Sequence, residues 1–206
     1  MITHEIYLRL EQCFGHAPTT EQKSAMRVFT EFLVCRNPHS MMLMRGSAGT
    51  GKSSLAGAFV RAMALLGQKT VLMAPTGLAA KVFSLNSGGH AAFTIHRKIY
   101  RLRAFAGVGG EYNLNDNLHA DTLFMVDEAS MVANGGGVEA GFGSGRLLDD
   151  LVRYVYSGRN CRLVLIGDQA QLPPVGEELS PALDTQFMEG YGMEVFACNL
   201  NEVVRQ

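Results

Sequence analysis

The sequence predicts an α/β fold in which helices cover both faces of a mostly parallel β-sheet. Short apolar runs with the length of buried strands alternate with segments of helical periodicity, the pattern typical of parallel sheets. A glycine-rich motif joins one such strand to the helix that follows, which is the arrangement of a P-loop NTPase. The 206 residues, 47 % of them hydrophobic and 18 % charged, suffice for one domain with a sizeable core.

The first clear helix carries its own start signal near residue 18. Thr19 as N-cap and Gln22 three residues later form a capping box, and apolar residues then recur at helical spacing as far as Leu33. Asn37-Pro38 ends this helix. The further expected elements are, in chain order, a strand at 41–44, a helix at 52–66 capped by Gly67, a strand at 70–74, a helix at 78–84, a strand at 123–126, a helix at 146–156 and a strand at 162–166.

Three segments carry no such pattern. Residues 1–17 are expected to form an N-terminal appendage to a domain of residues 18–206. Residues 107–117 are polar and rich in glycine or asparagine, which predicts either a loop or a small hairpin. Between residues 135 and 145 six of eleven positions are glycine, so we expect 134–145 to be a flexible loop within the domain.

Hydropathy, cysteine spacing and charge exclude several classes of protein. The most apolar helical segment, residues 55–66, is interrupted by Arg61, so we expect no membrane span, and the N-terminus lacks a signal-peptide pattern. The four cysteines form no Cys-x-x-Cys pair, which argues against a zinc or redox site and favours reduced thiols in a cytoplasmic protein. The net charge of −1 implies that any contact with nucleic acid is local.

A phosphate-binding loop is the strongest functional signal. The run Gly46-Ser47-Ala48-Gly49-Thr50-Gly51-Lys52-Ser53 matches G-x-x-x-x-G-K-[ST] between an expected strand and an expected helix, and Ser54 extends the predicted nucleotide-binding set. Glycines let backbone N–H groups converge on the phosphates, and the helix N-terminus adds partial positive charge. Lys52 is expected to reach the β- and γ-phosphates, and Ser53 is expected to ligate Mg²⁺. The absence of an Asn-Lys-x-Asp segment favours ATP over GTP.

A pair of carboxylates complements the phosphate loop. Asp127 and Glu128 directly follow the apolar strand at 123–126, so both are expected at the edge of the sheet where nucleotides bind. Asp127 would serve Mg²⁺, and Glu128 would orient and deprotonate the attacking water. Two acidic residues that merely cap a turn are the alternative interpretation.

Six short stretches together carry a family resemblance. Gly-Asp-Gln-Ala-Gln-Leu-Pro-Pro-Val, combined with Asp-Glu-Ala-Ser-Met, is specific to the RecD-like 5′ to 3′ branch of superfamily 1 helicases, and the chain resembles the first RecA-like motor domain of that family from about residue 18 onward. The stretches are residues 18–22, 46–53, 74–80, 126–131, 167–175 and 204–206.

The resemblance implies roles for three further residues near the nucleotide. Gln22 would read the edge of adenine, since an amide donates and accepts together, and the capping-box role stands beside this one. Gln171 would sense the γ-phosphate, the alternative being a solvated loop residue stiffened by neighbouring prolines. Arg205 would neutralise charge on the γ-phosphate in the transition state, against the alternative of a solvated terminal charge. The catalytic set is thus Lys52, Glu128, Gln171 and Arg205.

The resemblance also implies contacts with single-stranded DNA. Pro75, Thr76 and Gly77 correspond to a loop that touches the strand's backbone, although an ordinary strand-to-helix turn would look the same. His96 and Arg97 lie in the only local concentration of positive charge, which suits a DNA contact or wedge but equally a solvated helix face.

Family members carry two RecA-like domains, and this sequence shows only the first. We therefore expect a monomeric piece of an ATP-dependent 5′ to 3′ DNA helicase that alone binds nucleotide weakly and hydrolyses it poorly, because the partner domain supplies an arginine. A nucleotide-controlled binding module that unwinds nothing is the alternative. A small-molecule kinase is disfavoured because nothing resembles a lid.

Overall fold

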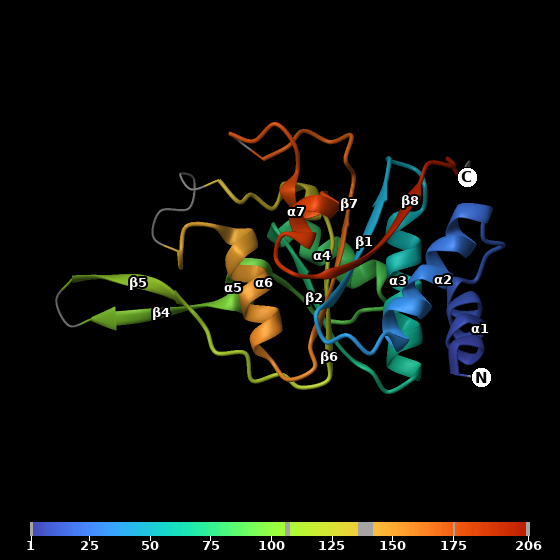
Figure 1. Ribbon diagram of the computed structural model, residues 1–206, viewed down its shortest axis with the longest axis horizontal. Helices are drawn as coiled ribbons and strands as arrows, with labels where there is room; N and C mark the ends of the chain where they lie inside the picture. Colours follow the sequence, from blue (N-terminus) through green and yellow to red (C-terminus); the bar gives the residue numbers. More distant parts are fainter. Residues whose placement is uncertain (1, 106–107, 136–141, 175, 205–206) are drawn as a thin grey trace.

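The central sheet of the protein consists of six parallel strands. The structure, a computed structural model, describes residues 2–105, 108–135, 142–174 and 176–204. The strand order is β3-β2-β6-β7-β1-β8, and every neighbouring pair is parallel (Figure 1). This confirms the expected fold class. The strands are β1 (Ser40–Gly46), β2 (Lys69–Ala74), β3 (Ala92–Thr94), β6 (Thr122–Val126), β7 (Arg162–Gly167) and β8 (Glu194–Leu200).

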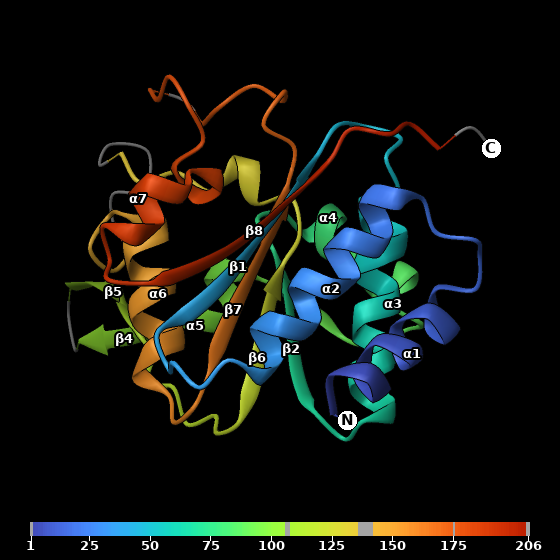
Figure 2. The same cartoon turned by 45° about the vertical axis from the view of Figure 1, so that its right-hand side comes forward.

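Helices cover both faces of this sheet (Figure 2). Two separate clusters of buried apolar side chains fill the space between the sheet and the two helical layers. Phe29 and Phe59 stack at 4.0 Å between their ring centroids in the first of these clusters. The first face carries α1 (Ile2–Phe14), α2 (Thr20–Val34), α3 (Lys52–Leu65) and α4 (Gly77–Asn86), and the second carries α5 (Ile95–Ile99), α6 (Leu147–Ser157) and α7 (Thr185–Glu189), with short 3₁₀ turns η1 (Ala129–Met131) and η2 (Pro181–Leu183).

The N-terminal segment, expected only as an appendage, forms helix α1. Its residues Ile6, Leu10 and Phe14 are buried in the same apolar cluster as α2 and α3. The guanidinium of Arg61 on α3 donates to the carbonyl oxygen of Cys13 at 3.0 Å and so ties the end of α1 to α3. Residues 2–14 therefore add a fourth helix to this layer.

The predicted capping signals are confirmed. The Thr19 hydroxyl accepts from the backbone N–H of Gln22 at 3.3 Å, and the side-chain oxygen of Gln22 accepts from the backbone N–H of Thr19 at 3.0 Å. Helix α3 ends at Leu65, and Gly67 adopts a φ of 70°, the left-handed conformation that follows many helix ends.

A two-stranded hairpin extends from the body of the molecule on the side of α5 and α6 (Figure 1). Strands β4 (Tyr100–Phe105) and β5 (Val108–Leu114) pair antiparallel, which decides between the loop and the hairpin expected for residues 107–117. Phe142 stacks on Tyr112 of β5 at 4.4 Å between ring centroids. The glycine-rich segment lies partly outside the described residues, since the structure describes 134–135 and 142–145 of it.

Two further observations bear on the excluded classes. None of the helices that the structure describes is long and apolar enough to cross a membrane. All four cysteines are free thiols, and burial raises the pKa of Cys198 to about 12 and also raises that of Cys161.

Gly57 in the middle of α3 provides a test of how α3 and α4 pack. A Cβ atom added at Gly57 would lie 2.1 Å from the carbonyl oxygen of Asn86 at the end of α4. An exposed helix interior gains about 1 kcal/mol from Gly→Ala, but the clash with backbone reverses the sign here. We expect Gly57→Ala to lower the free energy of unfolding by about 1–3 kcal/mol, measured by urea denaturation.

Gly77→Ala is the matched control for that measurement. Gly77 opens α4, and nothing lies within 4 Å of its added Cβ. We expect this variant to be as stable as the parent chain or slightly more so. A Gly57→Ala protein that unfolds at the same urea concentration as Gly77→Ala would contradict the tight contact between α3 and α4.

Candidate nucleotide-binding site

The predicted nucleotide-binding residues meet at one edge of the sheet. Because all neighbouring strands are parallel, the segments that follow their carboxyl ends lie along the same edge. The phosphate loop follows β1, Asp127 and Glu128 follow β6, and Asp168 to Gln171 follow β7. Residues 201–204 leave β8 at this edge as well.

Close packing shapes the phosphate loop. Gly49 and Gly51 have φ values of 80° and 83°, conformations that L side chains rarely adopt. A Cβ at Gly51 would lie 2.6 Å from the amide nitrogen of Gln22, and one at Gly46 would lie 2.8 Å from the Leu200 carbonyl oxygen. The Thr50 hydroxyl donates to the Ser47 carbonyl oxygen at 2.8 Å. The loop is thus a backbone cradle that side chains at these glycines would fill.

Lys52 opens helix α3 and folds over this cradle. Its ammonium donates to the carbonyl oxygens of Gly46 and Ser47, the latter at 2.8 Å. The same nitrogen lies 3.9 Å from a carboxylate oxygen of Asp168, which is 5 % exposed at the end of β7. The lysine therefore connects the phosphate loop with the segment that carries Gln171.

Asp127 is a buried carboxylate at the end of β6. Burial raises its pKa to about 6, and the neighbouring Glu128 carboxylate acts in the same direction. A hydrogen bond of 2.9 Å from the backbone N–H of Glu128 and the charge of Lys52 lower the pKa and partly offset that effect. The carboxylate oxygens of Asp127 and the hydroxyl of Ser53, in the first turn of α3, are ligands of the kind that suits Mg²⁺.

Glu128 has an unusual backbone conformation. Its φ of 53° and ψ of 37° place it in the left-handed region, shared by only two other non-glycine residues among those that the structure describes. Such conformations cost free energy and persist where the surroundings impose them, often at functional sites. Glu128 is half-buried and directly follows Asp127 in the sequence, so two acidic residues stand in succession at the end of the strand.

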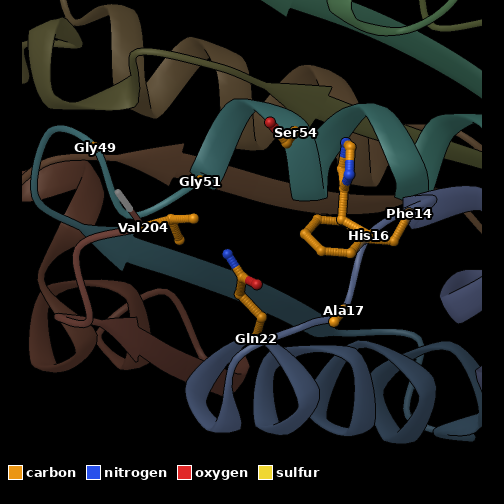
Figure 3. Close-up of a pocket in the computed structure, with 8 residues that line it drawn as sticks. All are labelled: Phe14, His16, Ala17, Gln22, Gly49, Gly51, Ser54 and Val204. Atoms are coloured by element: carbon orange, nitrogen blue, oxygen red, sulfur yellow. The ribbon is translucent and has the colours of Figure 1, made fainter. Parts of the chain in front are cut away.

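A cavity of about 680 Å³ lies beside the phosphate loop (Figure 3). The Gln22 amide points from α2 toward the loop and donates to the Thr50 carbonyl oxygen at 3.1 Å. Gln22 is only 2 % exposed and also completes the capping box, so one side chain joins the start of α2 to the loop. The residues that line the cavity are Phe14, His16, Ala17, Gln22, Gly49, Gly51, Ser54 and Val204.

Two aromatic rings of this cavity were missed from the sequence. Phe14 and His16 form an edge-to-face pair with 6.1 Å between ring centroids, at the end of α1 and directly after it. The packing of α1 against α3 brings both rings to the cavity, and no local sequence pattern indicates that contact. The one sequence signal that could have indicated them is the presence of two aromatic residues just before the Pro18-Thr19 capping signal.

Gln171 and Ser130 join two of the converging segments. The Ser130 hydroxyl donates to the side-chain carbonyl oxygen of Gln171 at 2.9 Å. Gln171 itself is exposed, and its backbone N–H donates to the Asp168 carbonyl oxygen at 3.3 Å. The residue is therefore neither a free loop side chain nor a buried one.

The segment after β8 is held against the start of α2. The Glu21 carboxylate accepts from the backbone N–H groups of Asn201 and Glu202, the latter at 2.7 Å, and from the Asn201 side chain at 3.2 Å. The Val204 N–H then donates to the Gly49 carbonyl oxygen at 3.0 Å. The segment thus passes beside the phosphate loop. Arg205, expected to act in catalysis, lies outside the described residues.

We expect Glu21→Gln to loosen this segment and to lower the melting temperature at neutral pH. Backbone hydrogen bonds from Glu202 and Asn201 lower the pKa of Glu21 below its ordinary value of 4.5. A carboxylate with a depressed pKa stabilises the fold above its unfolded pKa, and the effect is lost as the pH falls through the folded pKa. The difference in melting temperature between the two proteins should therefore shrink on acidification below about pH 4.5.

Glu202→Gln controls for the change in charge. It removes one negative charge from the same segment, but it keeps the Glu202 backbone N–H that donates to Glu21. If Glu202→Gln and Glu21→Gln shift the melting temperature equally, the carboxylate contacts do not hold the segment.

Several known proteins resemble this chain. The ATP-dependent RecD2 DNA helicase of Deinococcus radiodurans is 33 % identical over 137 residues, which cover 66 % of this chain and 16 % of that protein. The ATP-dependent DNA helicase PIF7 of Trypanosoma brucei brucei is 32 % identical over 174 residues, or 75 % of this chain and 15 % of that protein. The chain thus spans about a sixth of the length of these curated relatives.

Solved structures of Pif1 helicases share the fold. The Candida albicans enzyme superposes with a TM-score of 0.54 at 23 % identity, covering 93 % of this chain and 41 % of that one. The Bacteroides enzyme in complex with ADP-AlF3 and ssDNA gives a TM-score of 0.52 at 17 % identity, covering 93 % and 43 %.

A family described as an AAA domain matches residues 18–206, nearly the whole chain. The chain belongs to this family. It is the RecA-like motor domain of a superfamily 1 helicase of the RecD-like and Pif1-like branch, as the sequence resemblance implied. The motor domain binds nucleotide, in keeping with the ATP-dependent helicases that it matches.

The candidate DNA contacts of the motor domain follow β3, an edge strand of the sheet, and its neighbour β2. Pro75, Thr76 and Gly77 follow β2, where the Thr76 hydroxyl caps α4 by accepting from the Ala79 N–H at 3.2 Å. His96 and Arg97 lie on α5, directly after β3. Gly77 and Arg97 both line one surface hollow of about 340 Å³ between α4 and β3.

Proposed function

We propose that this motor domain binds and hydrolyses ATP to drive 5′ to 3′ movement along single-stranded DNA in a helicase. The observation that carries the proposal is the convergence of the phosphate loop, the Asp127–Glu128 pair and the Gln171 segment on one edge of the sheet. The ATP-dependent DNA helicases RecD2 and PIF7 support the same assignment.

The proposed roles at the phosphates follow from position and chemistry. Backbone N–H groups of residues 46–51 would bind the phosphates, and the Lys52 ammonium would exchange the Gly46 and Ser47 carbonyls for β- and γ-phosphate oxygens. Ser53 and Asp127 would hold Mg²⁺, which would neutralise phosphate charge when bound. Glu128 would accept a proton from the attacking water. Gln171 would contact the γ-phosphate, and Arg205 would approach it from the segment that passes Gly49.

We propose that the base occupies the 680 Å³ cavity. The Gln22 amide borders this space, and its second N–H and its carbonyl oxygen have the donor and acceptor character that the edge of adenine requires. The rings of Phe14 and His16 supply flat apolar surface on the α1 side of the same space (Figure 3). Ser54, in the first turn of α3, lines the same space.

DNA is proposed to bind across the ends of β2 and β3. Thr76, Gly77 and Arg97 offer a hydroxyl, backbone N–H groups and a guanidinium without reading sequence, which suits phosphate contacts. The near-neutral net charge of the chain is consistent with DNA contacts that are confined to a few loops. A DNA partner also accords with the expected cytoplasmic location.

A second RecA-like domain is proposed to complete the motor. The chain covers 41–45 % of the matched Pif1 structures, which supports one of two such domains. Without a partner domain the chain is expected to act as a monomer with slow hydrolysis, since an arginine supplied in trans contributes about 10³ to 10⁵ in rate.

The deciding experiment measures ATP hydrolysis by the chain, and by a protein that joins it to a second RecA-like domain, with and without oligo-dT. We expect DNA to stimulate the two-domain protein, which should also unwind a duplex with a 5′ single-stranded tail. Nucleotide binding with identical hydrolysis rates in the presence and absence of DNA would contradict the motor function and favour a nucleotide-controlled binding module.

A further inference from the structure

Ser130 connects the two halves of the catalytic edge. It lies in η1, two residues after Glu128, and its side chain is fully buried. Its hydroxyl donates to the Gln171 carbonyl oxygen at 2.9 Å across 41 positions of sequence. The hydroxyl is thus a direct link between the segment after β6 and the segment after β7.

Close backbone packing keeps this link in place. A Cβ atom at Gly167, the last residue of β7, would lie 2.9 Å from the backbone nitrogen of Ser130. Only glycine therefore permits η1 to approach the end of β7 so closely. A second pair of contacts ties the same two segments together, since the Glu177 carboxylate accepts from the N–H groups of Asn134 and Gly135, both at 2.6 Å.

The direction of the hydrogen bond decides which end of the Gln171 amide faces Ser130. When the serine hydroxyl donates to the amide oxygen, that oxygen faces Ser130 and the NH₂ group of the amide remains available to another partner. A phosphate oxygen accepts hydrogen bonds, so only the NH₂ end can bind it. An amide turned the other way would present a carbonyl oxygen to a negative phosphate.

We propose that Ser130 is a positioning residue that orients the Gln171 amide for the γ-phosphate. The inference rests on the proposed role of Gln171 as γ-phosphate sensor and adds the residue on which that role depends. It also links the sensor to the backbone that carries Glu128, because η1 begins directly after that residue. Displacement of Gln171 when the γ-phosphate leaves would therefore reach the catalytic carboxylate within two residues.

The test compares binding of ADP with binding of AMP-PNP, which differs by the γ-phosphate. We expect Ser130→Ala to weaken AMP-PNP binding about three- to tenfold, the range of one lost hydrogen bond, while ADP binding changes less than about twofold. Gln171→Ala should show the same selective loss. The double variant should lose no more than Gln171→Ala alone, because Ser130 acts through Gln171.

Ser40→Ala is the matched control. Ser40 is also fully buried, its hydroxyl has no hydrogen-bond partner among the described residues, and it begins β1 at the opposite edge of the sheet. This variant reports the effect of removing a buried hydroxyl alone, and we expect its ratio of AMP-PNP to ADP affinity to equal that of the parent chain.

Each remaining outcome has a distinct meaning. A normal affinity ratio in Ser130→Ala beside a reduced ratio in Gln171→Ala would overturn the positioning role and leave the sensor role intact. Parallel loss of both nucleotides, or losses that add in the double variant, would show a merely structural serine and would also overturn the inference. A Gln171→Ala protein with a normal ratio would refute the sensor role, and the positioning role with it.

Discussion

Glu128→Gln should abolish ATP hydrolysis while leaving nucleotide binding intact. The amide keeps the size of the side chain and removes the carboxylate that is proposed to accept a proton from water. General-base catalysis contributes about 10² to 10⁴ in rate, so hydrolysis should fall by that factor in a single-turnover measurement with excess protein and Mg²⁺. The affinity for ADP should change less than about twofold, because no contact in the phosphate loop is altered.

Glu189→Gln controls for the loss of one negative charge. Glu189 is exposed at the end of α7 and lies outside the segments that form the site. Its variant should hydrolyse ATP at the parental rate. A Glu128→Gln protein with parental hydrolysis would exclude this carboxylate as the base. A Glu128→Gln protein that loses both hydrolysis and ADP binding would indicate that the left-handed turn had collapsed.

Lys52→Ala should weaken nucleotide binding itself. The ammonium is the cation closest to the phosphate cradle among the described contacts, 2.8 Å from the Ser47 carbonyl oxygen. Hydrogen bonds to charged groups contribute about 1.5–3 kcal/mol each, which corresponds to a loss of about 10- to 150-fold in affinity for ATP, measured by calorimetry. ADP should lose less affinity than ATP, since the proposed contacts of Lys52 include the γ-phosphate.

Lys69→Ala removes the same charge from the opposite edge of the sheet. Lys69 is exposed at the first position of β2, whereas the phosphate loop follows the last position of β1. Its nucleotide affinity should match that of the parent chain. Equal losses in the two lysine variants would mean that net charge, not the position of Lys52, governs binding.

Local signals explain why much of the fold was predictable. The capping box at Thr19 and the glycine after α3 are encoded within a few residues, and the four central strands are continuous apolar runs because both of their faces are buried. Strand β8 escaped prediction because polar residues interrupt the apolar run of an edge strand that is only partly buried. Helix α1 also escaped prediction, because its apolar residues are buried by tertiary packing against α3 and not by a strong local pattern.

The candidate site likewise has parts that local sequence signals encode and parts that only tertiary packing brings together. Contiguous motifs identified the phosphate loop and the Asp127–Glu128 pair, because a strand followed by a turn dictates where those residues lie. The base cavity brings together Phe14, Gln22 and Val204, which are far apart in the chain, and no local pattern encodes that meeting. The bond between Ser130 and Gln171 is of the same kind.

The order of the strands sets the distances between the proposed sites along this edge of the sheet. Neighbouring strands lie about 4.8 Å apart, so the Gln171 segment after β7 is one step from the phosphate loop, and Asp127 after β6 is about 10 Å away. The proposed DNA contacts after β2 and β3 are three and four steps away, about 14–19 Å. The proposed ATP and DNA sites therefore do not overlap on this edge, and the segments that follow β6 and β7 lie between them.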